Sequence, residues 1–518
     1  ILKERKYVII NFLIIIQGAM KDNLLDKKVL AMYDVRGIQN YIFKSNLAKE
    51  IIGASAIVDS IIINGLEEYK KTKIEIEKRN YYLTDWKNDN ANEFFDNSHV
   101  DMQVMFIGGG NAYVLFRTGA ICEKVNHFLG KYVLDKTYSL NLSVAVVAMT
   151  ESYKDDYASI NNEMRRIKSY MPLTQPVGAL PFMMSDSITG YPITHIEKGE
   201  KYCTESYLKR EAFYHLPERE DEKIFDNMVT QKGDNSILAV CHIDGNSMGV
   251  RIINTMKDKR LYKDAIPAMR KLSVEIAETF DSAYNSMESF MSELSSKVKV
   301  NSKYKLYRKI ITAGDDITFV CNAKLAIPAV KYFLQNLGME YSACGGIAFF
   351  NSHFPFSDAY QVAEACCDSA KKRAKLDICR GKNGKIGCYL DYQVCTNISA
   401  AQLEKYREKN YVTDMGSIIY RPYYVSVDGE SALNEKNKQY NIDRLYECVK
   451  YIKELPRSKA KQLRDAISIG RNEKDSCIAL LESRGFKDVT KAKDEYSIWY
   501  DALEIMDLLI MGDTDNED

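Results

Sequence analysis

The sequence has no excess of either charge and no cysteine pair at metal-binding spacing. Its 518 residues contain 71 Lys and Arg and 71 Asp and Glu, so the formal net charge is zero. Proteins that bind nucleic acid by bulk electrostatics are usually basic, so we expect any contact with a polyanion to be local. None of the 12 cysteines has CxxC spacing, and Cys366 and Cys367 are adjacent. The cysteines therefore predict neither a disulfide framework nor a zinc ribbon, and they favour reduced thiols in the cytoplasm.

The sequence also lacks an apolar run long enough for a membrane helix. The first residues are basic and are followed by an apolar run over 7–16, shorter than the ~20 residues that a spanning helix needs. This pattern resembles the core of a signal peptide, but Met20 precedes a polar stretch and then a strand. We interpret Met20 as the natural start and 1–19 as an upstream segment outside the core or an added strand. We expect a cytoplasmic protein without membrane contact.

An internal repeat organises the rest of the chain. VLAMYDVRGIQNYIF (29–43) and ILAVCHIDGNSMGVRI (237–252) each contain an apolar run, an aspartate, a glycine and a helical pattern. MQVMFIGGGNAYVLF (102–116) and RKIITAGDDITFV (308–320) each predict two strands joined by a tight glycine turn. LSVAVVAM (142–149) and ACGGIAFF (343–350) each predict a strand before a helix. Each half therefore reads strand, helix, hairpin, helix, strand, helix.

This order predicts an α+β fold with two ferredoxin-like (βαββαβ) palm domains in tandem and a helical C-terminal domain. The alternative is a chance similarity between two short α/β stretches. Proline and glycine mark a linker between the palms, and strand patterns fade after about residue 395. The predicted parts are a segment at 1–19, a first palm at 20–172, a linker at 173–225, a second palm at 226–395 and a helical domain with an acidic tail at 396–518.

Candidate catalytic carboxylates gather in the second half. Asp244 ends an apolar strand, and Asp315 and Asp316 follow Gly314 at the hairpin turn. A glycine-preceded turn lets these carboxylates lean toward the neighbouring strand. Hard cations such as Mg²⁺ or Mn²⁺ prefer carboxylate and phosphate oxygens, and two ions can support transfer of a nucleotide. We predict a two-metal site at Asp244, Asp315 and Asp316, with Ile243 as a further ligand; the alternative is that the paired aspartates are ordinary turn residues.

Residues that follow Asp244 predict a phosphate site, because backbone amides at a helix start bind phosphate. Asn246 and Ser247 can also act as helix N-caps, and we expect both roles. Lys371, in the helix after the last strand, is a candidate for the triphosphate or a plain solvated lysine. The predicted ATP site comprises Gly245, Asn246, Ser247, Met248, Gly249, Gly314 and Lys371.

The first half keeps only one of the carboxylates. Its hairpin reads Gly108, Gly109, Gly110, Asn111, so Gly110 and Asn111 align with Asp315 and Asp316. Asp34 alone cannot hold two metals, so we predict that the first palm is catalytically inactive. Its glycine turn can still admit a nucleotide, because glycine allows close backbone approach. The alternative is a domain retained for packing.

These motifs resemble a known family. The DGNSMG segment at 244–249, the AGDD hairpin and the segment at 346–375 are similar to the active palm of the large subunit of type III CRISPR effector complexes. The first half, with IIGASAIVDS (51–60) and its GGGN turn, resembles that family's degenerate palm. LPRSKAKQLRDAI (455–467) resembles its C-terminal helical domain. The resemblance covers most of 28–395, although a Gly-Asp-Asp turn also occurs in other palm polymerases and diguanylate cyclases.

The resemblance implies a nucleotidyltransferase that joins ATP through 3′–5′ bonds into cyclic oligoadenylate, a second messenger of antiviral defence. It implies metal binding by the three aspartates and a phosphate-side role for Lys371. It also implies RNA-guided complex subunits or target RNA as partners and activators. The first palm becomes a nucleotide platform formed by Asp34, Ser55, Gly109, Gly110 and Asn111.

Three departures from the family pattern narrow this expectation. The six histidines are scattered, so no HD nuclease and no DNA cleavage are expected. Cys203 is the only thiol near the stretch at 185–196 where a zinc ribbon would stand, so we expect no zinc. The chain is also short for the family.

Several functions stay open on the sequence. A nuclease-less effector subunit and a stand-alone synthase are both compatible with it. The stand-alone enzyme could be a homo-oligomer and could make a cyclic dinucleotide. Further alternatives are a non-catalytic RNA-binding scaffold subunit and a GTP-using homodimer similar to diguanylate cyclases.

Overall fold

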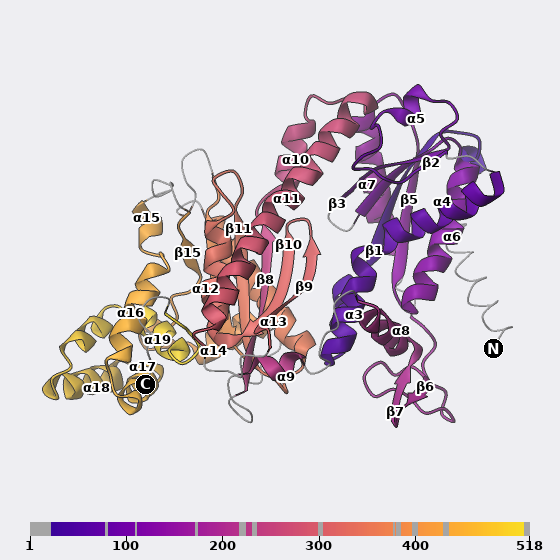
Figure 1. Cartoon of the computed structure of the whole chain (residues 1–518). Coiled ribbons are helices and arrows are strands. Elements are labelled where there is room, and N and C mark those ends of the chain that lie inside the picture. The colour runs from indigo at the N-terminus through magenta and orange to yellow at the C-terminus, as the bar shows by residue number, and fades with distance from the viewer. Residues whose placement is uncertain are drawn as a thin grey trace. The chain divides into compact units, whose positions relative to one another are not determined.

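The chain folds as an α+β protein with mixed sheets, as predicted (Figure 1). The computed structural model describes residues 22–77, 81–108, 111–170, 175–216, 224–229, 236–298, 304–376, 379, 385–395, 402–427 and 435–511. The upstream segment 1–19, Gly109 and Gly110 lie outside these residues.

The chain divides into two compact units. The first comprises Ile1–Glu222 and Ser247–Glu278, and the second comprises Lys223–Asn246 and Thr279–Asp518. Part of the range predicted for the second palm therefore groups with the first unit, and helix α11 (Tyr262–Ser295) contributes to both. The domain ranges taken from the sequence stay a prediction.

Besides part of α11, the first unit has elements that include a five-stranded sheet and a separate two-stranded sheet. They are η1 (Asp22–Leu24), β1 (Val29–Arg36), α2 (Ile38–Ile42), α3 (Ala48–Asp59), α4 (Ile61–Glu77), β2 (Tyr82–Leu83), α5 (Glu93–Asp96), β3 (Met102–Gly108), β4 (Asn111–Phe116), α6 (Gly119–Thr137), β5 (Asn141–Ala148), α7 (Tyr153–Tyr170), β6 (Ile193–Glu197), β7 (Glu200–Cys203), α8 (Thr204–Tyr214) and α10 (Met248–Met256).

The second unit contains a six-stranded sheet and the C-terminal helices. Its elements are α9 (Ile224–Met228), β8 (Ile237–Gly245), β9 (Tyr307–Ala313), β10 (Asp316–Asn322), α12 (Ala323–Gln335), β11 (Ala343–Asn351), α13 (Phe356–Ala374), β12 (Cys388–Val394), α14 (Leu403–Asn410), β13 (Val412–Thr413), β14 (Gly416–Ser417), β15 (Tyr423–Val425), α15 (Glu435–Lys438), α16 (Asp443–Lys453), α17 (Arg457–Ile469), α18 (Arg471–Ser483), η5 (Lys487–Lys493) and α19 (Tyr496–Ile505).

The two sheets share one four-strand arrangement. The first contains the order β5-β1-β4-β3 and the second the order β11-β8-β10-β9, and all neighbours within these sets are antiparallel. Parallel strands extend each sheet, β2 beside β3 and β12 beside β11. The order of these four strands is therefore the same in both sheets.

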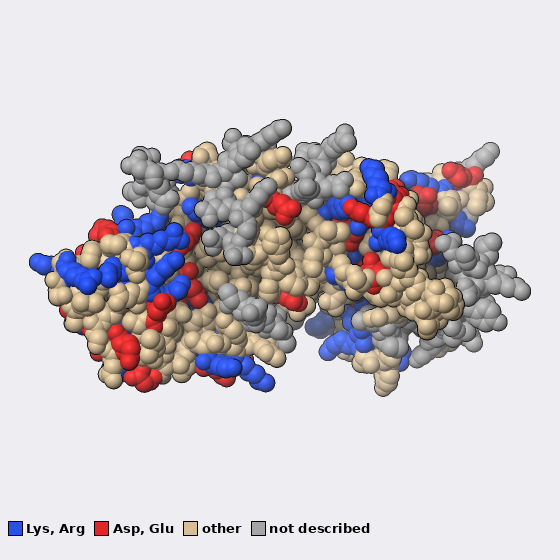
Figure 2. All heavy atoms as spheres, turned by 90° about the horizontal axis from the view of Figure 1, so that it is seen from below, with Lys and Arg blue, Asp and Glu red and all other residues tan. Residues whose placement is uncertain are grey.

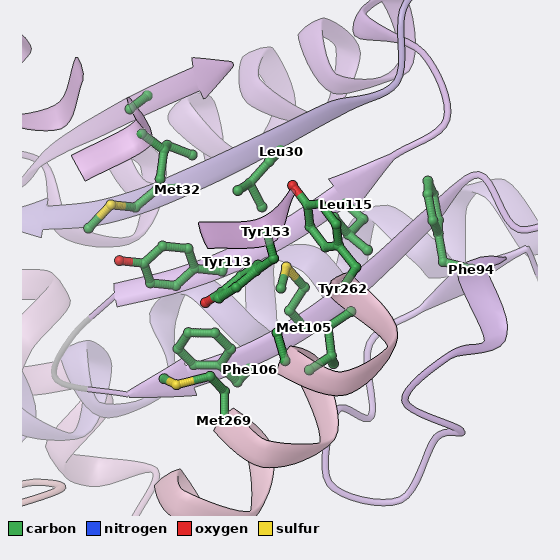
Figure 3. Close-up of a cluster of buried hydrophobic side chains, with 14 of the residues drawn as sticks. Leu30, Met32, Phe94, Met105, Phe106, Tyr113, Leu115, Tyr153, Tyr262 and Met269 are labelled. Atoms are coloured by element: carbon green, nitrogen blue, oxygen red, sulfur yellow. The ribbon is translucent and has the colours of Figure 1, made fainter. Parts of the chain in front are cut away.

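Apolar side chains of the first sheet pack against α7 and the start of α11 (Figure 3). Phe106 and Tyr113 stack with ring centroids 4.8 Å apart. Tyr262 of α11 is buried among them, and its hydroxyl donates a 2.7 Å hydrogen bond to Oδ2 of Asp156 on α7. The hydrophobic pattern of α11 thus attaches its first turns to the first unit.

Two adjacent glycines of β11 allow helices to approach both faces of the second sheet. A Cβ on Gly346 would lie 2.0 Å from the carbonyl oxygen of Ala363 on α13. A Cβ on Gly345 would lie 2.4 Å from Cγ1 of Val330 on α12. Because successive strand residues face opposite sides, α13 and α12 cover opposite faces of β11.

The stretch predicted as a linker at 173–225 also contains regular structure. Strands β6 and β7 form a hairpin, and α8 packs on α3. Arg210 Nε donates a 2.7 Å bond to Glu50, and buried Lys209 donates 2.7 Å bonds to Glu205 and to the carbonyl of Tyr41. Charged residues usually indicate a solvated surface in a sequence, which is why this buried interface was not predicted.

The region after residue 395 is helical from α16 to α19, as predicted, but it also contains strands. β15 pairs with β12 and extends the second sheet across the predicted boundary. Arg421, next to β15, is buried and pairs with Asp501 (2.9 Å) and Glu504 (2.6 Å) of α19. A strand of three residues is too short to be recognised from a periodic pattern.

The surface carries both signs of charge. Lys and Arg side chains are interspersed with Asp and Glu on the face shown in Figure 2. In the part of the chain that the structure describes, every helix is too short or too polar to cross a bilayer.

Candidate active site

The central strands of the second sheet place two carboxylates opposite each other. Asp316 is the first residue of β10 and pairs with Asp244 of the antiparallel neighbour β8. Directly opposite residues project from the same face of a sheet, so the two carboxylates share a face. Asp315 precedes Asp316 in the turn, where Gly314 has a φ of 70°. The structure therefore pairs Asp244 with Asp316 and places Asp315 beside Asp316 in the turn.

Burial and mutual repulsion disfavour the charged state of the turn carboxylates. Burial, and then the charge of Asp244, raises the pKa of Asp315 to about 6. Burial, and then Asp244 and Asp315, raises the pKa of Asp316 to about 7. Like charges held this close are costly without a counter-ion. A cation bound here would relieve the repulsion.

Lys371 supplies a positive charge at this face. It lies near the end of α13, and its Nζ contacts Oδ2 of Asp244. Burial lowers the pKa of Lys371, but the hydrogen bond and charge of Asp244 outweigh this effect and raise it overall. The close approach of α13 at Gly346 places this lysine above the carboxylates.

The donor atoms fit a hard divalent cation. Oδ1 of Asp316 is buried and receives no hydrogen bond, although it lies 3.3 Å from Nδ1 of His242. Among the described residues, no three His, Cys, Asp or Glu side chains are gathered as a ready metal site. Asp244 contacts Lys371 instead. The side chain of Ile243 is buried and faces away from the two aspartates, so only its backbone is available to a metal.

The segment after Asp244 opens helix α10. Ser247 occupies the N-cap position, as predicted, with a φ of 59°, but its side chain makes no capping hydrogen bond. Asn246 is buried, and its Nδ2 donates to Ser342 Oγ (3.2 Å) and to the carbonyl of Gly387 (3.3 Å). Asn246 thus anchors the loop and does not cap the helix. Gly245 ends β8, and Met248 and Gly249 begin α10.

The first half repeats this strand pairing but keeps only one of the three carboxylates, Asp34. Asn111 pairs with Asp34 across β4 and β1, so it occupies the place of Asp316, as the alignment predicted. Lys168 of α7 lies 2.8 Å from Oδ2 of Asp34, which parallels Lys371 and Asp244. The sequence interpretation missed Lys168. Ser55 lies in α3.

Aligning the two halves on these lysines reveals a further acidic residue. Glu364 and Asn161 each stand seven residues before the lysine of their helix. The charge of Glu364 contributes to the raised pKa of Asp316. The first half thus has amides, Asn111 and Asn161, where the other half has carboxylates. This internal comparison could have identified Glu364 from the sequence.

Comparisons with known proteins identify structural neighbours of the whole chain. No protein-family model and no curated protein sequence matches. A crystal structure of a Csm1–Csm4 cassette in complex with cA4 matches at 12% identity and a TM-score of 0.46, covering 96% of this chain and 72% of that chain. A Csm1–Csm4 subcomplex of the type III-A CRISPR–Csm interference complex matches with the same values. Csm1 of T. onnurineus matches at 12% identity and 0.46, with coverages of 93% and 69%. These neighbours come from the family that the motifs resemble.

Proposed function

We propose that this chain is a metal-dependent nucleotidyltransferase that joins ATP through 3′–5′ bonds and closes the product into cyclic oligoadenylate for antiviral defence. The register of the second sheet carries the proposal, because it sets Asp316 opposite Asp244 with Asp315 in the adjoining turn. The first half has Asn111 at the same register position. A cluster of repelling carboxylates in one half only is typical of a catalytic site.

We interpret each half as a ferredoxin-like palm. The shared antiparallel order, in which the first strand lies between the third and the fourth, supports this interpretation. The second palm is the catalytic one. The first palm is the platform for a second nucleotide, and the Asp34–Lys168 pair, with Asn111 beside it, forms its polar end.

Two Mg²⁺ or Mn²⁺ ions would be held by Asp244, Asp315, Asp316 and the backbone of Ile243, and no zinc is expected. Such ions supply activation of a ribose hydroxyl and charge neutralisation on the leaving pyrophosphate. When ATP binds, the ammonium group of Lys371 would leave the carboxylate of Asp244, bind the triphosphate and orient the triphosphate. The amides of Gly245, Asn246, Ser247, Met248 and Gly249, with Gly314, line the phosphates.

The proposed setting is a cytoplasmic RNA-guided complex. The matched Csm1–Csm4 structures are complexes with cA4 and with one ATP, and we propose the same ligand class for this chain. Partner subunits or target RNA would then activate synthesis. A stand-alone homo-oligomer is the alternative setting.

Product analysis tests the proposal. The protein is incubated with ATP or GTP and Mg²⁺ or Mn²⁺, with and without candidate RNAs, and products are identified by mass spectrometry. We expect cyclic oligoadenylate from the wild type, none from Asp316→Ala, and a measurable rate from Asn111→Ala. Equal and complete loss in both variants contradicts the assignment of the inactive palm.

Other outcomes identify the alternatives. Product formed without RNA favours a stand-alone enzyme, and a cyclic dinucleotide identifies a different synthase. No product that depends on Asp316 under any condition overturns the catalytic proposal and favours the scaffold function.

A further inference from the structure

A buried polar pair lies directly beneath the carboxylates. His242 of β8 and Thr318 of β10 are register partners, one pair inward from Asp244 and Asp316 on the same face. His242 is 4% exposed and Thr318 is fully buried. Nδ1 of His242 lies 3.2 Å from Oγ1 of Thr318 and 3.3 Å from Oδ1 of Asp316. The edge of the Tyr360 ring on α13 meets the imidazole, with centroids 5.7 Å apart.

The position of the imidazole links the two strands at the site. Nδ1 of His242 lies within reach of both Oγ1 of Thr318 and Oδ1 of Asp316, which belong to the same strand, β10. The ring is therefore packed against the carboxylate of Asp316 on one side and the hydroxyl of Thr318 on the other.

The first half shows whether the sheet needs a polar pair such as His242 and Thr318 in order to fold. Met32 and Tyr113 hold the same register positions in β1 and β4. Both belong to the apolar cluster of Figure 3, where Tyr113 stacks on Phe106. Burying polar groups costs free energy unless they are bonded, and the same sheet forms with an apolar pair. The fold therefore does not require His242 and Thr318.

We propose that His242, supported by Thr318, is a positioning residue that orients the carboxylate of Asp316 for cation binding and nucleotidyl transfer. The polar pair occurs in the half that has Asp316 and is replaced in the half that has Asn111. This inference rests on the proposed function. Residues that orient a metal-binding group typically change metal affinity or activity by about 10–100-fold.

Substitutions at His242 separate positioning from packing. His242→Met introduces the residue of the first half, whereas His242→Asn keeps an amide donor near the place of Nδ1. Cys241→Ala, on the opposite face of the same strand, is the matched core control because Cys241 is fully buried. Each full-length variant is assayed for kcat and for KM with ATP. Mn²⁺ binding is measured separately from the free-ion signal in electron paramagnetic resonance, and folding by thermal unfolding.

We expect His242→Met to lower kcat about 10–100-fold, to leave KM within about threefold and to weaken Mn²⁺ binding about 10–100-fold. His242→Asn should recover most of both losses, and Cys241→Ala should change stability only. The inference is overturned if His242→Met has the kcat and Mn²⁺ affinity of the wild type. It is also overturned if kcat and Mn²⁺ affinity are no higher in His242→Asn than in His242→Met.

The variant Asp316→Asn shows whether a negative result refutes only the role of His242 or the proposed nucleotidyltransferase function as well. Product and Mn²⁺ binding that persist in Asp316→Asn refute the proposed function itself. If the wild type makes no product, the Mn²⁺ titration decides, and equal affinities in wild type and His242→Met overturn the inference.

Discussion

Replacing Asp316 with asparagine should stabilise the metal-free protein while abolishing the proposed nucleotidyl transfer. Asp316 is partly buried opposite Asp244, and its side chain is 31% exposed. The folded state raises its pKa from 3.8 to about 7, chiefly by burial and by Asp244. A carboxyl with a raised pKa binds its proton more tightly in the folded state. Its contribution to stability is therefore complete below pH 3.8 and is lost as pH rises toward 7.

The size of the gain follows from this shift. A difference of about three pKa units corresponds to about 4 kcal/mol, since one unit is worth about 1.4 kcal/mol. Solvent screening of a partly exposed group and its electrostatic interaction with Asp315, which also has a raised pKa, reduce this to about 1–2 kcal/mol. Asparagine is nearly isosteric and carries no charge, so it should recover that amount at pH 8 and almost nothing at pH 4. For a unit of this size the gain is an upward shift of about 2–8 °C in its melting temperature.

The assay is thermal unfolding of wild type and Asp316→Asn in EDTA between pH 4 and pH 8, repeated with Mg²⁺. Mg²⁺ should stabilise the wild type and have less effect on the variant. Asp391→Asn is the control and should lower the melting temperature. Asp391 is fully buried and pairs with Arg407 at 2.8 Å, so removing its charge leaves the buried charge of Arg407 unpaired. The reasoning is refuted if Asp316→Asn melts at or below the wild-type temperature at pH 8 in EDTA.

Three further predictions concern packing and charge. Gly346→Ala should destabilise the second unit by about 3 kcal/mol, because the added Cβ would clash with the backbone of α13. Gly249→Ala is the control and should be neutral or slightly stabilising, because the space around its Cβ is open. Equal denaturation midpoints of the two variants would contradict this prediction. Lys371→Met should raise KM for ATP about 10–100-fold, the loss of one charged hydrogen bond, and unchanged initial-rate curves would exclude a phosphate role. Arg421→Met should cost about 3–5 kcal/mol in urea unfolding, since it leaves Asp501 and Glu504 without their buried partner; a smaller loss would show that the network is not structural.

The sequence predicted the parts of the fold that depend on local pattern. Both hairpins form where a glycine turn separates two apolar runs, at 102–116 and 308–320. The equivalence of Asn111 and Asp316 follows from the same turns, because turn length determines hairpin register. The strands before α7 and α13 also occur as predicted.

Elements stabilised by distant partners were not predicted. Helix α8 is held by Arg210 and Lys209, whose acidic partners on α3 and α8 give no periodic signal. Strand β15 is three residues long and forms because β12 offers an unpaired edge. The role of Lys168 was missed for the same reason, since its contact with Asp34 spans 134 residues of chain.

The sequence by itself determined which residue types stand at the hairpin turns, and hence that only one half has carboxylates at its turn. Only the tertiary structure decided which side chains lie beside these carboxylates. Helix α13 approaches because Gly346 leaves room, and this brings Lys371 to Asp244. Strand pairing places His242 and Thr318 beneath Asp316. Local pattern specifies strands and turns, but burial and charge pairing depend on neighbours that the chain supplies from far away.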